Sequence, residues 1–348
     1  MNTKFEYIIV GQGIAGSMVA HTLLSRGKNV LVIDEFHSKS SSNIASGVVN
    51  PITGRKMVKT WMIDEILPFA KQTYKNLEVL LQAQFVHENK LLKIFSSNDD
   101  IEQWKKRQAD VAYAPYMGDM ISPEDIHPSI NAPFGAGIIK QAFGVSVPEF
   151  TKATRVFLKS QNRLLEEHFE YDKLQISDTL QYKNIEADKI IFCEGYKAYQ
   201  NPFFKWIPFC FAKGEQLLIH SEKLETNSVL NKNIFVIPIG NHLFKVGSTF
   251  IWDDMEEKVT DAGREEILQK YKKISGDEFT IVEESAAIRP AMRDRRPVVG
   301  RHPEHQNLFV FNGMGTKGVS LTPYFSNYLA DFLEQNFKIL PEISMDRF

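Results

Sequence analysis

The sequence predicts an α/β fold that opens with a strand–helix–strand unit. Three observations carry this prediction: an apolar run at residues 5–10, helically spaced apolar positions from Ile14 to Ser25, and a second apolar run from Val30 to Asp34. Two apolar strands joined by a helix are typical of a right-handed βαβ unit in a parallel sheet. The 348 residues indicate about two domains, at roughly 150 residues each.

The rest of the chain alternates between helical and strand-like patterns. Helical patterns cover residues 62–84, the stretch after the possible cap Ser97, and residues 148–162, 260–274 and 319–337. Strand-like patterns, including an apparent hairpin at 85–95, cover residues 164–171, 174–176, 180–185, 189–193, 234–239, 243–246 and 308–311. Between Pro115 and Pro148 the chain carries five prolines and four glycines, which predicts loops and short strands.

Composition excludes several classes of protein. The 43 acidic and 41 basic residues give a formal charge of −2, so the whole chain has no basic field that would attract nucleic acid or anionic lipid. Two cysteines, Cys193 and Cys210, indicate a reducing compartment rather than a disulfide framework. Because no run approaches about 18 apolar residues and no signal segment is visible, we expect a cytoplasmic protein that binds no membrane. His302 and His305 are interpreted as part of a surface turn, and no metal site is expected.

The sharpest motif is Gly11-Gln12-Gly13-Ile14-Ala15-Gly16, which lies between the first strand and its helix. Gly11 permits a tight turn, Gly13 permits close approach of the backbone to a pyrophosphate, and Gly16 permits packing of helix on sheet. Asp34 ends the second strand, where its carboxylate can accept both hydrogen bonds from an adenosine ribose. The pattern predicts a dinucleotide site, but it does not separate a nicotinamide from a flavin cofactor.

Six further motifs follow in a fixed order: Ala45-Ser46-Gly47, Gly144-Val145-Ser146-Val147-Pro148, Lys213-Gly214-Glu215, Ile288-Arg289-Pro290, residues 294–300 and residues 309–318. In this order and spacing, from Tyr7 to about Leu333, the sequence resembles the D-amino-acid oxidase and glycine oxidase superfamily of FAD enzymes. The resemblance implies a Rossmann-like FAD-binding domain formed by residues 1–75, 140–200 and 285–348. It also implies an inserted substrate domain, mainly antiparallel sheet, formed by residues 76–139 and 201–284.

The resemblance also implies the residues that meet FAD. Beside the glycine motif these are Asp34, Glu35, Ala45, Ser46, Gly47, Val147, Glu194, Gly195, Arg289, Gly313, Gly315, Thr316, Lys317 and Gly318. Val147 would meet the adenine edge through its backbone. Since no cysteine follows Cys210 near the C-terminal loop, we expect the FAD to be non-covalent.

Three residues are expected at the reacting end. Arg289 matches the family position whose guanidinium clamps a substrate carboxylate above the flavin. Gly315 and Lys317 precede the last predicted helix, where backbone amides and an ammonium group are placed to stabilise negative charge on the flavin.

The resemblance favours an oxidase or dehydrogenase that oxidises the C–N bond of an amino acid or N-substituted glycine by hydride transfer to flavin N5. Oxygen or another acceptor would take the electrons. Two alternatives stay open. The stretch from Ala45 to Pro51 and the Gly315–Gly318 loop also look like the oxidoreductase half of an enzyme that modifies the wobble uridine of tRNA, although the charge of −2 argues against nucleic acid. The other alternative is a flavin-binding scaffold without turnover.

Overall fold

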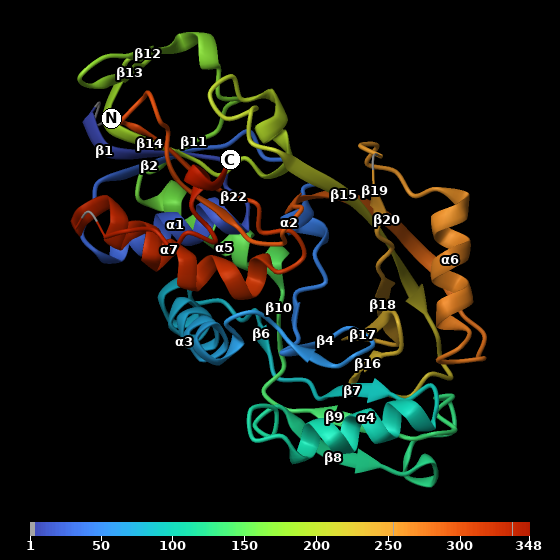
Figure 1. Ribbon diagram of the computed structural model, residues 1–348. Coiled ribbons are helices and arrows are strands. Elements are labelled where there is room, and N and C mark those ends of the chain that lie inside the picture. The colour runs from blue at the N-terminus through green and yellow to red at the C-terminus, as the bar shows by residue number, and fades with distance from the viewer. Residues whose placement is uncertain (1–3, 253, 336) are drawn as a thin grey trace.

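The computed structural model describes residues 4–252, 254–335 and 337–348, which fold around two large sheets (Figure 1). The strands of the first sheet are β1 (Lys4–Val10), β2 (Val30–Ile33), β11 (Leu164–Leu165), β12 (Leu174–Ile176), β13 (Leu180–Tyr182), β14 (Ile185–Phe192), β21 (Val298–Arg301) and β22 (Leu308–Asn312). The order is β11-β2-β1-β14-β13-β12, with β22 paired to β14 and β21 paired to β22. Strands β11, β2, β1, β14 and β22 are parallel, which confirms the predicted α/β fold with its βαβ start.

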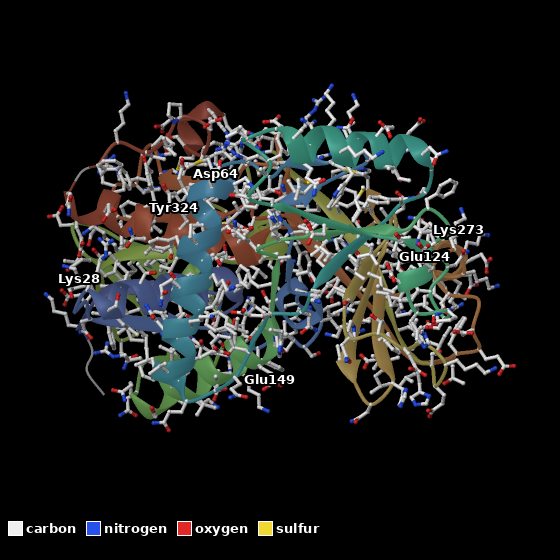
Figure 2. All side chains as sticks on the ribbon, turned by 90° about the horizontal axis from the view of Figure 1, so that it is seen from below. Lys28, Asp64, Glu124, Glu149, Lys273 and Tyr324 are labelled. Carbon is white, nitrogen blue, oxygen red and sulfur yellow. The ribbon has the colours of Figure 1, made fainter. Side chains whose placement is uncertain are left out.

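Four helices gather on one face of this sheet: α1 (Ile14–Ser25), α3 (Ile63–Leu81), α5 (Val147–Ser160) and α7 (Gly318–Gln335). Figure 2 looks onto this layer from below and shows α3 in front, with one end beside Tyr324 of α7 and the other near Glu149 of α5. In β1, Tyr7 and Ile9 pack against the helical side, whereas Ile8 and Val10 pack on the opposite side. Because both faces are buried, the strand is apolar along most of its length.

The second sheet has nine strands: β7 (Leu91–Ile94), β8 (Met117–Ile121), β9 (Ala136–Ile139), β15 (Phe209–His220), β16 (Val229–Asn231), β17 (Phe235–Gly240), β18 (Leu243–Gly247), β19 (Ile251–Trp252) and β20 (Thr280–Met292). Its order is β19-β15-β18-β17-β16-β7-β9-β8, and β20 also pairs with β15. All pairs are antiparallel except β7 with β16. Helix α6 (Asp261–Tyr271) packs on one face through Ile267 and Tyr271, and Trp104 of α4 (Asn98–Ala109) lies against Gly137 of β9.

Strands β15 and β20 connect the two sheets. They pair in antiparallel register from Phe209 with Met292 to His220 with Thr280. Met292 belongs to the core beneath the first sheet, whereas Leu217 and Ile219 belong to the core under α6. In Figure 1 this pair runs from beside the first sheet into the second. One continuous ribbon therefore takes part in both cores.

The remaining elements are short. They are α2 (Ser41–Ile44), β3 (Val48–Val49), β4 (Ile52–Thr53), β5 (Val58–Lys59), β6 (Val86–His87), β10 (Phe143–Val145), η1 (Pro123–Asp125), η2 (Tyr171–Lys173), η3 (Gly195–Gln200) and η4 (Met345–Arg347). Among the described residues, no helix combines the length and the apolar character needed to cross a membrane.

Two expectations about local structure are wrong. The segment 85–95 is not a hairpin, because β6 pairs with β10 while β7 is occupied on both edges by β9 and β16. The strand expected at 164–171 ends at Leu165, after which Phe169 turns to stack on Tyr182 at a ring distance of 4.4 Å. The turn expected at His302 and His305 is present between β21 and β22, but the His302 side chain within it is buried, and its Nδ1 accepts hydrogen bonds from Glu304 N and His305 N.

Candidate active site

A cavity of about 820 Å³ lies where the carboxyl ends of β1, β2 and β14 meet the inner face of the second sheet. Clefts beyond the carboxyl ends of parallel strands are the usual ligand sites of open α/β sheets. The structure brings most of the predicted site residues to its lining: Gly11, Gly13, Ile14, Ala15, Asp34, Glu35, Ala45, Ser46, Gly47, Val147, Glu194, Gly195, Arg289, Gly315, Thr316 and Gly318. Gly16, Gly313 and Lys317 are not part of the lining.

The glycine turn has no room for a side chain at Gly11 or Gly16. Gly11 has φ +96°, and a Cβ there would lie 2.6 Å from the carbonyl oxygen of Cys193 at the end of β14. A Cβ on Gly16 would lie 1.8 Å from the carbonyl oxygen of Gly11. Gly16 thus serves the close packing of α1 on the turn, while Gly13 caps the start of α1 on the cavity side. Ile14 N at this helix start donates to Ser42 Oγ at 2.9 Å, and the rest of the backbone there, which borders the cavity, fits the pyrophosphate of a dinucleotide.

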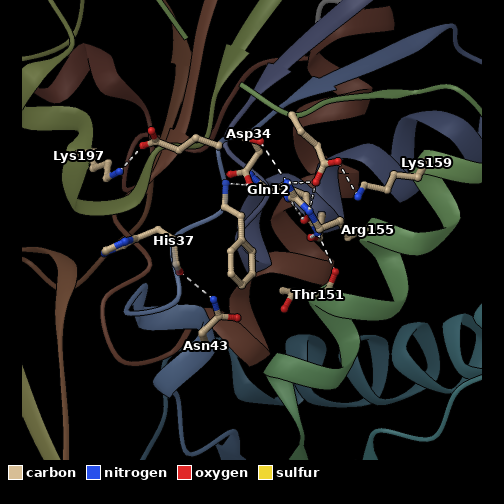
Figure 3. Close-up of polar contacts among 12 residues, drawn as sticks. Gln12, Asp34, His37, Asn43, Thr151, Arg155, Lys159 and Lys197 are labelled. Carbon is tan, nitrogen blue, oxygen red and sulfur yellow. Dashed lines mark hydrogen bonds and ion pairs between the residues drawn. The ribbon is translucent and has the colours of Figure 1, made fainter. Parts of the chain in front are cut away.

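Asp34 is part of a hydrogen-bonded network at this end of the cavity (Figure 3). Its Oδ2 accepts a hydrogen bond from Gln12 N at 2.8 Å, and its Oδ1 accepts from Phe36 N at 2.8 Å and from Arg155 Nη1 at 2.7 Å. An ionised carboxylate offers about four acceptor positions. Asp34 therefore retains about one position for a ribose hydroxyl rather than the two expected from sequence.

Arg155 is a residue that the sequence did not reveal. It also binds Glu166 through Nη2 at 2.8 Å and lies on the cavity lining. One turn earlier on α5, Thr151 accepts a hydrogen bond from Gln12 Nε2 through its carbonyl oxygen at 2.9 Å. The spacing of four between Thr151 and Arg155, on a helix that starts at the predicted adenine contact Val147, was the available signal.

Glu194 follows β14 and reaches the same lining. Tyr171 Oη donates a hydrogen bond to its Oε1, and Asn201 Nδ2 donates to its Oε2 at 2.7 Å. Burial raises the pKa of Glu194 to about 7, although both hydrogen bonds favour the ionised form. The carboxyl group is therefore held by neutral donors rather than by a cation in direct contact.

The Ala45–Gly47 segment follows α2 and is fixed against strands from elsewhere in the chain. Gly47 has φ +74°, and a Cβ there would lie 1.9 Å from the carbonyl oxygen of Val145. Gln216 of β15 donates from Nε2 to the carbonyl oxygen of Ile44 at 2.7 Å, and Ser46 Oγ donates to Gln216 Oε1 at 3.3 Å. These contacts fix the position of the Ala45–Gly47 backbone at the edge of the cavity.

The loop before α7 is tied to the strand that carries Arg289. Gly315, at φ +55°, donates its N–H to the carbonyl oxygen of Pro290 at 2.9 Å. Lys317 lies nearby but does not line the cavity. Burial lowers the pKa of Lys317, and the charges of Arg296 and Arg295 lower it further. The backbone of Gly315 is thus better placed than the Lys317 ammonium to meet a ligand.

Arg289 lies in β20, on the wall of the cavity that the second sheet forms. Its Nη2 donates to Ser248 Oγ at 2.6 Å and to the carbonyl oxygen of Thr249 at 3.1 Å, while Nη1 donates to the carbonyl oxygen of Lys213 at 3.3 Å. A Cβ on Gly214 would lie 1.7 Å from Nη2, so the guanidinium fits over β15 only because residue 214 is glycine.

Arg289 has no acidic partner. In the part of the chain that the structure describes, no carboxylate forms an ion pair with its guanidinium. Burial lowers its pKa to about 10, which leaves it charged at neutral pH. The cavity wall thus carries an oriented cation whose charge the protein does not neutralise.

Lys93 of β7 is a second such cation on the lining, and it too was missed from sequence. It is 8% exposed. The available signal was a lone charge inside an otherwise apolar buried strand, Leu91-Leu92-Lys93-Ile94.

Comparison with known proteins identifies a family. The sequence profile of the DAO family, described as FAD dependent oxidoreductase, matches residues 6–332. A glycine oxidase from Bacillus licheniformis is 23% identical over 97% of this chain and 95% of its own length. The crystal structure of glycine oxidase from Geobacillus kaustophilus superposes with a TM-score of 0.82 at 18% identity and covers 98% of both chains, so the folds agree.

A third relative is longer. The tRNA 5-methylaminomethyl-2-thiouridine biosynthesis bifunctional protein of Legionella pneumophila (strain Corby) is 22% identical over 96% of this chain. The match covers 55% of that protein, so this chain spans about half of its length.

Proposed function

The chain belongs to the DAO family of FAD-dependent oxidoreductases, and on that premise we propose that it oxidises the C–N bond of an amino acid or N-substituted glycine. The observation that carries the proposal is the Arg289 guanidinium, a charged group on the cavity wall without an acidic partner. Three of its five N–H donors bind Ser248, Thr249 and Lys213. The Nε–H and one N–H of Nη1 remain without an acceptor among the described residues, and either can donate to a carboxylate.

The residues present fit FAD along the length of the cavity. Gly11 and Gly13 bring backbone to the pyrophosphate, Asp34 offers an acceptor to the ribose, and the backbone of Gly47 and Gly315 borders the side on which the flavin would lie. FAD, when bound, supplies the redox chemistry by accepting a hydride at N5 of its ring. We propose that it is held without a covalent bond.

Arg289 would then orient the substrate. Its neighbours Ser248 and Thr249 fix the plane of the guanidinium, and a fixed plane fixes the direction in which a bound carboxylate presents its Cα–H. No general base is required if the amine binds in its neutral form. The imine product would hydrolyse in water, and oxygen or another acceptor would take the electrons.

Anaerobic mixing of the holoenzyme with amino acids and N-alkyl glycines tests the proposal, because a substrate bleaches the flavin absorbance. Arg289→Leu should weaken binding of carboxylate substrates by about 2–5 kcal/mol, the usual loss when one partner of a buried charge pair is truncated. Arg289→Lys keeps the charge but not the planar fork and should restore little. Equal losses for carboxylates and uncharged amines would overturn the assignment, and absence of bleaching by every amine would favour the scaffold alternative.

The wobble-uridine reaction is the second candidate, supported by the similarity to the Legionella protein over 96% of this chain. Its substrate is itself an N-substituted glycine, which Arg289 would recognise in the same way. The charge of −2 weighs against it. Bleaching by tRNA that carries carboxymethylaminomethyl-uridine, but not by free N-alkyl glycines, would make it the better reading. The cytoplasmic location stays a prediction.

A further inference from the structure

The wall of the cavity formed by the second sheet and the β4–β5 loop has a one-sided charge. Residues 54, 55, 93, 214, 216, 231, 233–235, 247, 248, 287, 289 and 290 contribute to this wall. None of them is acidic, whereas Arg55, Lys93 and Arg289 are basic. The acids on the lining, such as Asp34 and Glu194, belong to the dinucleotide side. The wall is therefore built to face negative charge.

Lys93 is the buried member of this set that the proposed mechanism does not use. Its neighbours Leu92 and Ile94 pack into the core on the far side of the sheet, so Lys93 projects from the face that borders the cavity. The strand has β9 on one edge and β16 on the other, and Asn231 is its register partner in β16. Asn231 also lines the cavity, and its Nδ2, which donates one hydrogen bond to the carbonyl oxygen of Ile234 at 3.5 Å, has a second N–H for a ligand.

Within the described chain Lys93 has neither an ion pair nor a side-chain hydrogen bond. Among the described residues, Asp100 attracts its charge, whereas Lys232 and Arg55 repel it. Burial lowers its pKa. Among the described residues, the fully enclosed polar atoms that lack a partner belong to His21, Arg107, Glu215 and Tyr271. Lys93 Nζ is not one of them, so the ammonium group opens onto the cavity. A buried cation of this kind is stabilised when an anion binds.

Lys93 and Arg289 lie on strands that are well separated in the second sheet. The Arg289 guanidinium lies over Gly214 in β15, and Lys93 lies in β7, with β18, β17 and β16 between them. Neighbouring strands are about 4.8 Å apart, so the two strands lie about 19 Å apart along the sheet. This spacing favours two separate anion contacts over one carboxylate shared by both cations.

We propose that Lys93, with Asn231 and Arg55 beside it, is a second anion site, and that the substrate carries a second negative group at the end of an extended substituent. This rests on the proposed function, in which Arg289 holds the carboxylate next to the reacting carbon. The group at Lys93 would be a carboxylate or a phosphate. Arg55 is exposed at this edge of the cavity, so the second anion would sit near the opening.

Unreactive dianions test the site without turnover. Binding of succinate, adipate, suberate and 6-phosphonohexanoate to the oxidised holoenzyme would be measured by calorimetry and by perturbation of the flavin absorbance, with octanoate as the single-anion match for suberate. In the wild type, a long dianion should bind at least tenfold more tightly than octanoate, and succinate should gain nothing. Tighter binding of the phosphonate than of suberate would identify phosphate as the preferred group.

Lys93→Met should remove the advantage of the long dianion and leave octanoate binding unchanged, and Lys93→Arg should retain most of it. Lys90→Met is the matched control, because it removes the same charge from an exposed position three residues earlier and should change neither ligand. Equal binding of octanoate and every dianion in the wild type would overturn the proposal, as would equal losses for both ligands in Lys93→Met. A failure of the proposed function gives a different result. In that case Arg289→Leu would leave octanoate binding unchanged, with or without the Lys93 substitution.

Discussion

The two ends of the cavity treat charge in opposite ways. At the dinucleotide end Asp34 pairs with Arg155, Arg155 pairs with Glu166, and Glu166 pairs with Lys159, so the charges balance within the protein (Figure 3). At the substrate end Arg289 and Lys93 have no acidic partner in the described chain. The first end is complete before a ligand arrives, whereas the second holds unfavourable free energy that an anion relieves. Under the proposed function, the carboxylate of the substrate supplies the negative charge that the second end lacks.

The largest effect is expected where the dinucleotide end has no spare volume. Gly16→Ala places a methyl group 1.8 Å from the carbonyl oxygen of Gly11, and backbone at that position has no room to yield. We expect a loss of stability at the upper end of, or beyond, the about 1–3 kcal/mol typical of overpacking, together with loss of FAD retention. Thermal melting and the ratio of flavin to protein after purification measure both.

Gly276→Ala is the matched control, because no atom lies within 4 Å of the methyl group that it adds. It should melt like the wild type and keep its flavin. Normal flavin content in Gly16→Ala would show that the turn moves more freely than its contacts indicate.

The next prediction contrasts the two arginines directly. Arg155→Met breaks ion pairs with Asp34 and Glu166, so it should lower the stability of the protein, by about 1–3 kcal/mol, and weaken FAD binding. Arg289→Leu removes a half-buried cation that lacks an acidic partner, so it should leave stability unchanged or raise it. Denaturant titration of both variants in the same buffer gives the sign of each change in the free energy of unfolding. A large destabilisation in Arg289→Leu would mean that its bonds to Ser248 and Thr249 outweigh the desolvation of its charge.

A smaller effect is expected from Glu194, the carboxyl group at the dinucleotide end that is held by neutral donors. Burial raises its pKa to about 7 from an ordinary value of 4.5, so the folded protein binds a proton more strongly than the unfolded chain does. This contribution to stability is complete below about pH 4.5 and is lost as the pH rises through about 7. The difference in melting temperature between wild type and Glu194→Gln should therefore change steadily between pH 5 and 7.5, in favour of the variant at the higher pH.

Glu166→Gln provides the comparison for that measurement. Lys159 and Arg155 lower the pKa of Glu166, so its contribution is present above the ordinary value and is lost only on acidification. The melting difference for Glu166→Gln should stay flat between pH 5 and 7.5. A flat difference for Glu194→Gln as well would show that Glu194 titrates near its ordinary pKa.

The smallest effect is expected from Lys317. The sequence places its ammonium near the flavin, but the structure leaves it off the cavity lining. Lys317→Met should therefore shift the flavin midpoint potential by less than about 10 mV, where about 30 mV corresponds to 1.4 kcal/mol for a two-electron couple. If the midpoint potential instead falls by several tens of millivolts and the sulfite adduct forms more weakly, the Lys317 ammonium does stabilise negative charge on the flavin, as expected from the sequence.

The sequence predicted the local elements at the dinucleotide end better than the long-range contacts that form the substrate end. The helix expected from Ile14 to Ser25 has those bounds, because strand, turn and helix are adjacent in the chain and each carries its own pattern. Arg155, in contrast, meets Asp34 across 121 residues, and no local pattern pairs them. Strand β20 was not expected, because its first half is exposed and Pro290 interrupts its pattern. The charge of the substrate wall depends on β7 and β20 belonging to one sheet, which is a long-range property.

The bond from Gly315 N to the carbonyl oxygen of Pro290 has a consequence for how such a protein diversifies. It joins the loop before α7 to the residue after Arg289, so in the proposed complex the distance between the Arg289 guanidinium and the flavin ring is set by backbone and does not depend on the side chains of β7 and β16. Residues of β7 and β16 can then change over evolutionary time without moving the reacting carbon. Under the proposed function, substrate choice and reaction geometry are then separately adjustable in this fold.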